Sequence, residues 1–277
     1  MVNLLPAEME TLSLETCSVD LHLAFLRAIH ARGGVQGVEL ALAVARYEDE
    51  WLPRLAAGGC VELPTLAVTW VWHLHRLAPL RYASYCVARF GRVLDPGALA
   101  FGVGDDERLV ASTVGTEHAG VDVSPFHDVE RLGGYAVAAC SERQKNFLWQ
   151  CTGASYEDCA FLAAAVERYD RFLRLMGEHR SKFFVPSYDI DLAWHTHMLA
   201  DTSRYLSETA ARAGHPVDHD DSVNDRSEGS QLNVSWAETK SLWTEAYGET
   251  DRIDKQGATF RSSVQRRSTI PLNFESG

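Results

Sequence analysis

The stretch Val185-Pro-Ser-Tyr-Asp-Ile-Asp-Leu-Ala-Trp-His-Thr-His-Met-Leu199 decides how this chain is interpreted. It places two carboxylates, one tryptophan and two histidines within the nine residues from Asp189 to His197. An earlier stretch, Leu63-Pro-Thr-Leu-Ala-Val-Thr-Trp-Val-Trp-His-Leu-His-Arg-Leu77, has the same proline, tryptophan, two histidines and final leucine, each 122 positions earlier. The chain therefore carries two copies of one Trp-His-x-His pattern.

The same shift of 122 residues holds beyond the histidines. Arg46-Tyr47 falls on Arg168-Tyr169, and residues 25–78 share fourteen identities with residues 147–200 over 54 ungapped positions. Identities at Trp, His, Pro and Tyr in one constant register indicate an internal duplication, which has to be recognised before a fold is assigned. The sequence therefore predicts two tandem helical repeats related by a pseudo-twofold axis.

Both copies have the apolar spacing and the terminal residues that are typical of α-helices. Besides the Trp-His-x-His helix of each copy, we expect helices over about 18–33, 37–55, 81–90, 134–150, 155–178 and 233–247. Residues 95–133 instead combine frequent glycines with short β-branched runs, which is typical of irregular structure. We therefore predict one all-α domain with four parts: a first repeat at 15–92, an irregular insertion at 93–133, a second repeat at 134–248 and a polar tail at 249–277.

Composition disfavours several classes of function. The formal net charge of −12 argues against nucleic acid or an anionic membrane as the main partner. No window approaches eighteen uninterrupted apolar residues, and the first ten residues carry acids where a secretory signal carries lysine or arginine. Six cysteines without Cys-x-x-Cys spacing indicate reduced thiols. We expect a cytoplasmic protein with protein partners, no nucleic acid and no membrane.

The second copy concentrates residues that can bind a metal ion. Asp191 and His195 lie four residues apart and share one helix face, whereas His197 points roughly the opposite way from His195. The loop His219-Asp220-Asp221 adds one imidazole and two carboxylates, a donor set that suits a divalent ion better than a thiolate-based structural zinc site. His73 of the first copy is a further candidate ligand across the pseudo-twofold axis.

The same residues also have a structural interpretation. Trp72 and Trp194 would fill the core, and each imidazole, including that of His75, would bond a backbone carbonyl or a carboxylate. Each Arg-Tyr pair would be structural, with its arginine pairing a buried carboxylate. A packed core predicts dry histidines with partners, and a metal site predicts side chains that converge on one cavity, so both interpretations stay open.

Several segments match blocks of a known family. They are the stretch 185–199, the loop His219-Asp-Asp221, the segment Asp225-Arg-Ser-Glu-Gly-Ser-Gln-Leu-Asn233, the segment Trp243–Gly248, and Val71-Trp-His-Leu-His-Arg-Leu-Ala-Pro-Leu-Arg-Tyr82. Together they resemble the plant and fungal glycine-rich domain-containing protein-like family, over roughly residues 15–92 and 134–248. The resemblance implies a domain of unassigned biochemistry, linked to growth and stress responses. The glycine-rich tail and RNA-binding motif of some members do not occur in these 277 residues, so we expect no role that depends on them.

Two hypotheses follow from these observations. The first is a non-catalytic helical module that binds protein partners and whose motifs serve the core. The alternative is a divalent-metal-binding protein or metalloenzyme that uses Asp191, His195 and the loop His219-Asp220-Asp221, with His73 or His197 as further ligands.

Overall fold

The computed structural model describes residues 12–58, 62–102, 131–219, 222–223, 225–251 and 253–256. Within these ranges every regular element is a helix and no strand occurs, which confirms the predicted all-α fold. In chain order the α-helices are α1 (Thr16–Ala31), α2 (Gly37–Arg46), α3 (Leu52–Ala57), α4 (Leu66–Arg76), α5 (Pro79–Phe90), α7 (Val137–Gln150), α8 (Cys159–Glu178), α9 (Tyr188–Ala200), α10 (Thr202–Ala213), α11 (Gln231–Tyr247) and α12 (Ile253–Gln256). None of the helices in these ranges has the length and apolar character needed to cross a membrane.

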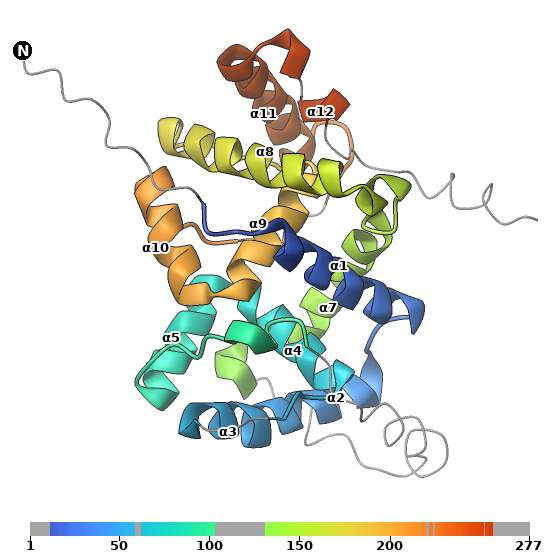
Figure 1. Ribbon diagram of the computed structural model, residues 1–277, viewed down its shortest axis with the longest axis vertical. Helices are drawn as coiled ribbons and strands as arrows, with labels where there is room; N and C mark the ends of the chain where they lie inside the picture. Colours follow the sequence, from blue (N-terminus) through green and yellow to red (C-terminus); the bar gives the residue numbers. More distant parts are fainter. Residues whose placement is uncertain are drawn as a thin grey trace, which may run out of the picture.

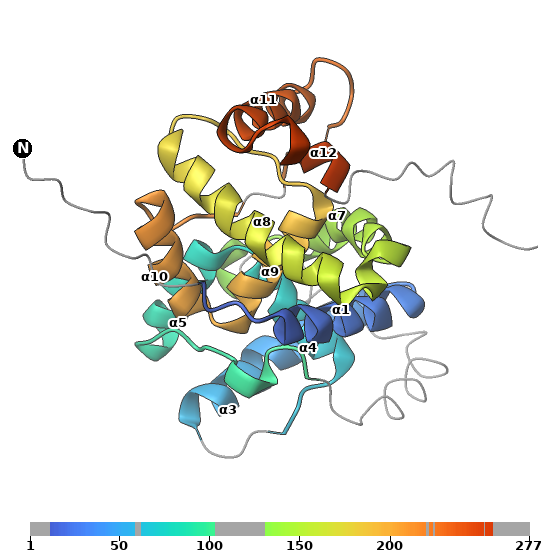
Figure 2. The same cartoon turned by 45° about the horizontal axis from the view of Figure 1, so that its top comes forward.

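The helices form two groups that meet at a buried centre. Figure 1 shows α2, α3, α4 and α5 in the lower half of the molecule and α8, α10 and α11 in the upper half. Helix α1 runs across the boundary between the groups and contacts α7, α8 and α9. Figure 2 shows α8 lying across α9, which it contacts. Helix α1 of the first copy is therefore packed against helices of the second copy.

Local sequence sets where the central helices begin and end. The side chain of Thr65 accepts a hydrogen bond from an amide of the first turn of α4, and that of Asp201 does the same for α10. Gly91 and Gly214 end α5 and α10 with φ angles of 73° and 77°, in the left-handed region that glycine adopts without a Cβ clash. The helix expected over 37–55 is divided by a π-helical turn, Tyr47–Trp51, after which Pro53 lies in the first turn of α3.

Helices α4 and α9, which carry the two Trp-His-x-His patterns, contact each other in the core. Every residue of α4 is buried, and Arg76 at its end donates a hydrogen bond to the carbonyl of Leu199 near the end of α9. The Arg76 guanidinium also donates to the carbonyl of Ala100 and lies 4.3 Å from the ring centroid of Trp72. Burial lowers the pKa of Arg76 to about 10, which leaves it charged at neutral pH. One buried cation therefore links the two helices that carry the Trp-His-x-His patterns.

Equivalent tyrosine–histidine contacts occur in both copies. Tyr47 Oη lies 3.1 Å from His75 Nδ1, and Tyr169 Oη lies 3.1 Å from His197 Nδ1. Both pairs are buried, and in both the partners are 28 residues apart in the chain. The second histidine of each pattern therefore has a tyrosine hydroxyl as its partner, where the structural interpretation predicted a backbone carbonyl or a carboxylate; only His197 also has a carboxylate nearby, that of Glu208 at 3.3 Å.

The tryptophans of the two copies also make equivalent contacts. In each copy the indole N–H donates to a tyrosine hydroxyl, which donates to a backbone carbonyl: Trp72–Tyr82–Leu94, at 3.1 and 2.6 Å, and Trp194–Tyr205–Val217, at 2.8 and 2.8 Å. These tyrosines are 123 residues apart, so the second copy has one extra residue between its motif and its tyrosine. The duplication stays a prediction, and the matched contacts favour it.

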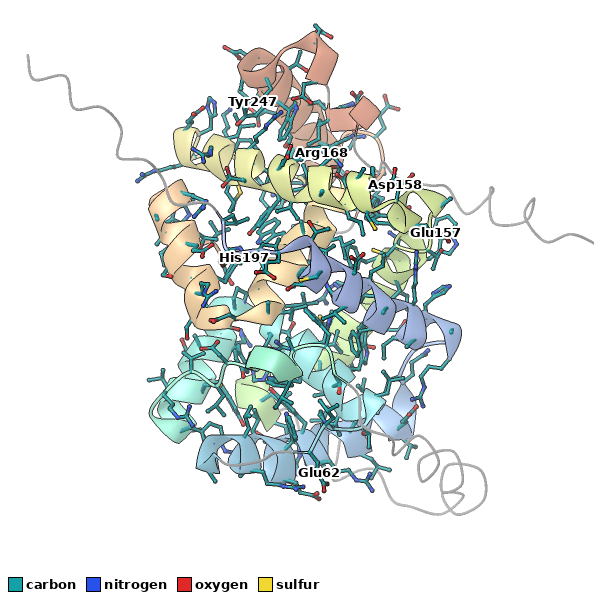
Figure 3. All side chains as sticks on the ribbon, in the orientation of Figure 1. Glu62, Glu157, Asp158, Arg168, His197 and Tyr247 are labelled. Carbon is teal, nitrogen blue, oxygen red and sulfur yellow. The ribbon has the colours of Figure 1, made fainter. Side chains whose placement is uncertain are left out.

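The two Arg-Tyr pairs differ in their arginines. Arg168 Nε donates to Asp189 Oδ2 at 2.7 Å, and both side chains are buried (Figure 3 labels Arg168 on α8). Arg46 is exposed, so the prediction of a buried carboxylate partner is wrong for it. The reason is local: Ala67 stands 122 residues before Asp189, and an alanine offers nothing to pair with.

Parts of the predicted insertion and tail lie outside the described residues. Of the insertion at 93–133, the structure describes 93–102 and 131–133, which contain short 3-10 turns at Gly97–Leu99 and at the start of Arg131–Gly134. The polar tail expected after residue 248 instead begins with helical turns, because Ile253 is buried against the core. Five cysteines of the described residues are free thiols, and Cys60 lies outside these residues.

Candidate metal centre

Three of the predicted ligands converge at one place. His195 Nε2 lies 3.0 Å from His219 Nε2 and 3.4 Å from Asp191 Oδ1. One donor atom from each of the three side chains lies within 4.8 Å of the other two. His195 is buried, while Asp191 and His219 are partly exposed. The arrangement therefore offers two imidazole nitrogens and one carboxylate oxygen to a single point.

Helix α9 and the loop after α10 bring these side chains together. Asp191 and His195 are one turn apart on α9, so their side chains share a face. The loop is held at Val217, whose carbonyl accepts from Tyr205 Oη at 2.8 Å and whose amide donates to a threonine hydroxyl of α10 at 3.2 Å. His219 follows two residues later and reaches across to the first copy, where its Nδ1 lies 3.0 Å from the carbonyl oxygen of Leu77.

The Leu77 contact fixes which nitrogen of His219 faces the site. A carbonyl oxygen can only accept, so Nδ1 of His219 carries the proton and Nε2 presents a lone pair toward His195. A backbone carbonyl that orients the far nitrogen of an imidazole is a common supporting contact of metal-binding histidines. His219 therefore has the tautomer and the orientation of a ligand.

The state of His195 follows from its burial. Burial, and then the neighbouring His219, hold the pKa of His195 well below its ordinary value of 6.5, so its ring is neutral at neutral pH. In the described part of the chain His195 Nδ1 has no hydrogen-bond partner. Because two lone pairs repel at 3.0 Å, either a proton on one of the two imidazoles or a cation must lie between the two Nε2 atoms.

The separations fit a first-row transition metal. Two nitrogen ligands that are about 2.0–2.1 Å from a tetrahedral zinc ion lie roughly 3.3 Å from each other. Two of the three observed separations, 3.0 Å between the nitrogens and 3.4 Å from His195 Nε2 to the carboxylate oxygen, bracket this value, and the third pair of donors lies within 4.8 Å. Small shifts of side chains would therefore be sufficient to bind an ion.

A pocket of about 240 Å³ opens beside these three side chains. Its walls come from α7, the segment before α9, α9 itself, the loop after α10 and the start of α11. Apolar side chains contribute one part of the lining, among them Phe147, Phe183, Trp194 and Leu232. An ion held by Asp191, His195 and His219 would therefore border a space large enough for a small molecule.

The other candidate ligands lie elsewhere. His197 is buried on another face of α9, between Tyr169 of α8 and Glu208 of α10, and Figure 3 shows it at the level of α10. Asp201, four residues after His197, caps α10 by accepting from the amide of Arg204, at 2.8 Å. The prediction of His197 as a ligand therefore disagrees with its position, because alternate residues of a helix point away from each other.

His73 and His75 are core residues of the first copy. The ring of His73 stacks on Trp70 at a centroid separation of 4.8 Å and contacts Phe25 at 5.5 Å. It is close enough to interact electrostatically with His195 and His219, but it is not one of the three side chains whose donor atoms converge. His75 pairs with Tyr47. His73 as a further ligand therefore stays a prediction, with its donor atoms outside the converging group. Asp220 and Asp221 lie outside the described residues.

Sequence reasoning missed two parts of this region. One is His22 of α1, a buried residue whose Nδ1 lies 2.8 Å from Thr196 Oγ1, next to His195. The other is a set of hydrogen-bond donors around Tyr188, which belongs to the quoted stretch and lies three residues before Asp191. The three-residue spacing to Asp191 predicts that Tyr188 lies on the same face of the helix, so Tyr188 could have been identified from the sequence. No local signal pointed to His22, because its partner lies 174 residues away.

Comparison with known proteins gives a consistent set of relatives. The family model described as glycine-rich domain-containing protein-like matches residues 81–208. Glycine-rich domain-containing protein 2 of Arabidopsis thaliana is 35% identical over 91% of this chain and 36% of its own length, and protein 1 of the same plant is 32% identical over 89% and 34%. The chain thus spans about a third of the length of these curated relatives. No solved structure matches it.

Proposed function

Since this chain belongs to the glycine-rich domain-containing protein-like family, whose name specifies no chemistry, we propose a function from its own side chains: it binds one divalent transition-metal ion through Asp191, His195 and His219. The single observation that carries the proposal is the approach of the two Nε2 atoms to 3.0 Å beside the carboxylate of Asp191. Two imidazoles and one carboxylate suit zinc or iron(II), whereas calcium and magnesium prefer oxygen ligands throughout.

The number of ligands favours a reactive site over a purely structural one. Structural zinc sites are closed by four protein ligands, whereas catalytic sites use three and keep a position for water or substrate. Here three side chains converge and a pocket lies beside them. We therefore propose a site of the open type, with the remaining positions facing the pocket. A metal ion there would lower the pKa of a bound water or polarise a bound carbonyl group.

The test is the metal content of the full chain. The protein would be produced without a histidine tag, equilibrated with zinc or, anaerobically, with iron(II), dialysed, and analysed by plasma mass spectrometry. We expect about one ion per chain. His219→Ala, which alters a partly exposed loop residue, and the double variant Asp191→Ala/His195→Ala should both lose the ion. His215→Ala is the matched control, because His215 is exposed four residues earlier on the same loop and should retain it.

A variant that loses the metal ion supports the proposal only if the variant is still folded. Circular dichroism should show the helical content of the parent in His219→Ala and in the control. A parent protein that holds no metal while folded would overturn the proposal, and the contact between His195 and His219 would then be an ordinary hydrogen bond. Retention of the ion by folded His219→Ala would equally exclude the proposed ligand set.

A second candidate, the non-catalytic module that binds proteins, is favoured by a different observation. Leu80 and Val87 on α5 are 38% and 51% exposed, and their spacing of seven residues places them on one helix face. We propose a protein partner, a cytoplasmic location and the implied link to growth and stress responses. The free thiols support the cytoplasmic location. The substitutions Leu80→Ser and Val87→Ser should abolish partner capture while leaving metal content unchanged.

A further inference from the structure

One wall of the pocket is rich in hydrogen-bond donors. Tyr188 Oη accepts from Asn146 Nδ2 and from Arg226 Nη2, each at 2.8 Å. The guanidinium carbon of Arg226 lies 5.6 Å from the centroid of the Tyr188 ring, so the arginine is held against the tyrosine. Asn146, Tyr188 and Arg226 all line the pocket, as do Arg143 and Lys182. Groups of this kind bind the oxygens of an anion.

Helix α9 sets the distance between this wall and the proposed metal ligands. Tyr188, Asp191 and His195 lie at positions i, i+3 and i+7 of α9, so all three project from one face. With a rise of about 1.5 Å per residue, Tyr188 is about 4.5 Å from Asp191 and about 10 Å from His195 along the axis. The donors and the metal ligands are therefore separated by about the length of a small molecule.

The charge of the pocket differs from that of the whole protein. The chain carries a formal net charge of −12. The described lining residues, however, include three cations (Arg143, Lys182 and Arg226) and two anions (Asp191 and Asp218), and Lys182 is paired with Glu238, so they carry almost no net charge. A bound divalent ion would make the pocket positive. A locally positive pocket on an acidic protein attracts an anion.

Resting on the metal site proposed above, we propose that the pocket binds a small organic acid. Its carboxylate pairs with Arg226 beside Tyr188, and a second oxygen at its other end reaches the metal. Its carbon chain lies along the apolar lining, which includes Phe183 and Leu232. The volume of about 240 Å³ lies just below the range of about 300–1,000 Å³ that is typical of small-molecule sites, so the acid is short.

Succinate and its neutral diamide, succinamide, are the matched probes. The full chain would first be loaded with cobalt(II), whose visible absorption reports its ligands, and the metal content would be measured before each titration. We expect succinate to bind with a Kd below about 1 mM and to change the cobalt spectrum. Succinamide should bind about tenfold or more weakly, because it lacks the charge that Arg226 recognises.

Two arginine variants separate recognition from folding. Arg226→Met should weaken succinate binding by about tenfold or more and leave the metal content unchanged, because Arg226 is exposed and is not one of the three proposed metal ligands. Arg204→Met is the control, since Arg204 is also exposed and does not line the pocket. It should bind succinate like the parent.

The possible failures are distinguishable. Protein that takes up cobalt but binds no succinate would overturn this inference and leave the proposed metal site standing. Protein that takes up no cobalt would overturn the metal site itself. Equal binding of succinate and inorganic phosphate would contradict the assignment to an organic acid, and unchanged affinity in the metal-free protein would contradict the contact between acid and metal.

Discussion

The buried ion pair between Arg168 and Asp189 gives a sharp prediction about stability. Asp189 is fully buried and Arg168 is 7% exposed at its side chain, with 2.7 Å between Nε and Oδ2. The guanidinium carbon of Arg168 lies 5.2 Å from the ring centroid of Phe161. Removing either partner therefore leaves a charge in the core without its counter-ion.

The two single substitutions should differ in cost. Arg168→Met strands a carboxylate that has no route to solvent, and it should lower the free energy of unfolding by about 3–5 kcal/mol. Asp189→Ala should cost less, about 2–3 kcal/mol, because the long arginine side chain can turn its charged end toward water. The double variant removes both charges and should cost only about 1–2 kcal/mol, so the coupling between the two sites is large.

Urea unfolding at pH 7, followed by tryptophan fluorescence, would measure these free energies. The seven tryptophans of the chain give a strong signal. For a chain of this size the loss in Arg168→Met corresponds to a fall in Tm of roughly 6–20 °C. If the double variant loses as much as the two single variants added together, the pair has no coupling and the argument from buried charge fails.

Three further predictions test other parts of the fold. Burial lowers the pKa of His22 and of His75 from 6.5 to about 3, so between pH 6.5 and 3 only the unfolded chain binds these two protons. The free energy of unfolding should therefore fall by about 1.4 kcal/mol for each histidine with every unit by which the pH falls below 6.5, and an unchanged free energy in urea unfolding between pH 7 and 5 would contradict this. Tyr47→Phe and Tyr169→Phe each remove one buried hydrogen bond and should each cost about 1 kcal/mol in urea unfolding; markedly unequal losses would argue against equivalent repeats. Gly177→Ala would place a Cβ 2.6 Å from a backbone carbonyl oxygen of α10, and the resulting separation of α8 from α10 should cost about 1–3 kcal/mol; an unchanged melting temperature would refute the close approach.

The sequence predicted the features that depend on short-range spacing. Apolar periodicity was sufficient for the helices, and the four-residue spacing of Asp191 and His195 was sufficient to place their side chains together. The opposite orientation of His197 follows from the same geometry. These features are local because one turn of helix determines them.

Features that depend on distant partners could not be predicted in the same way. The Arg-Tyr dipeptide is identical in both copies, yet Arg168 is buried and Arg46 is exposed, because only one of them meets an aspartate on the neighbouring helix. His219 was a candidate only as part of an acidic loop, and its contact with the Leu77 carbonyl spans 142 residues. The residue spacing around His219 or around Leu77 contains no information about a contact between two parts of the chain so far apart.

The contact between His22 and Thr196 also has a consequence for the protein during its synthesis. Ribosomes add about 5–20 residues per second, so the 174 residues between these partners take about 9–35 s to appear. During that interval the apolar face of α1, which includes Phe25, Leu26 and Ile29, has been synthesised but cannot yet pack against α8 and α9. Nascent chains of this protein should therefore depend on chaperones that cover α1 until the second copy emerges.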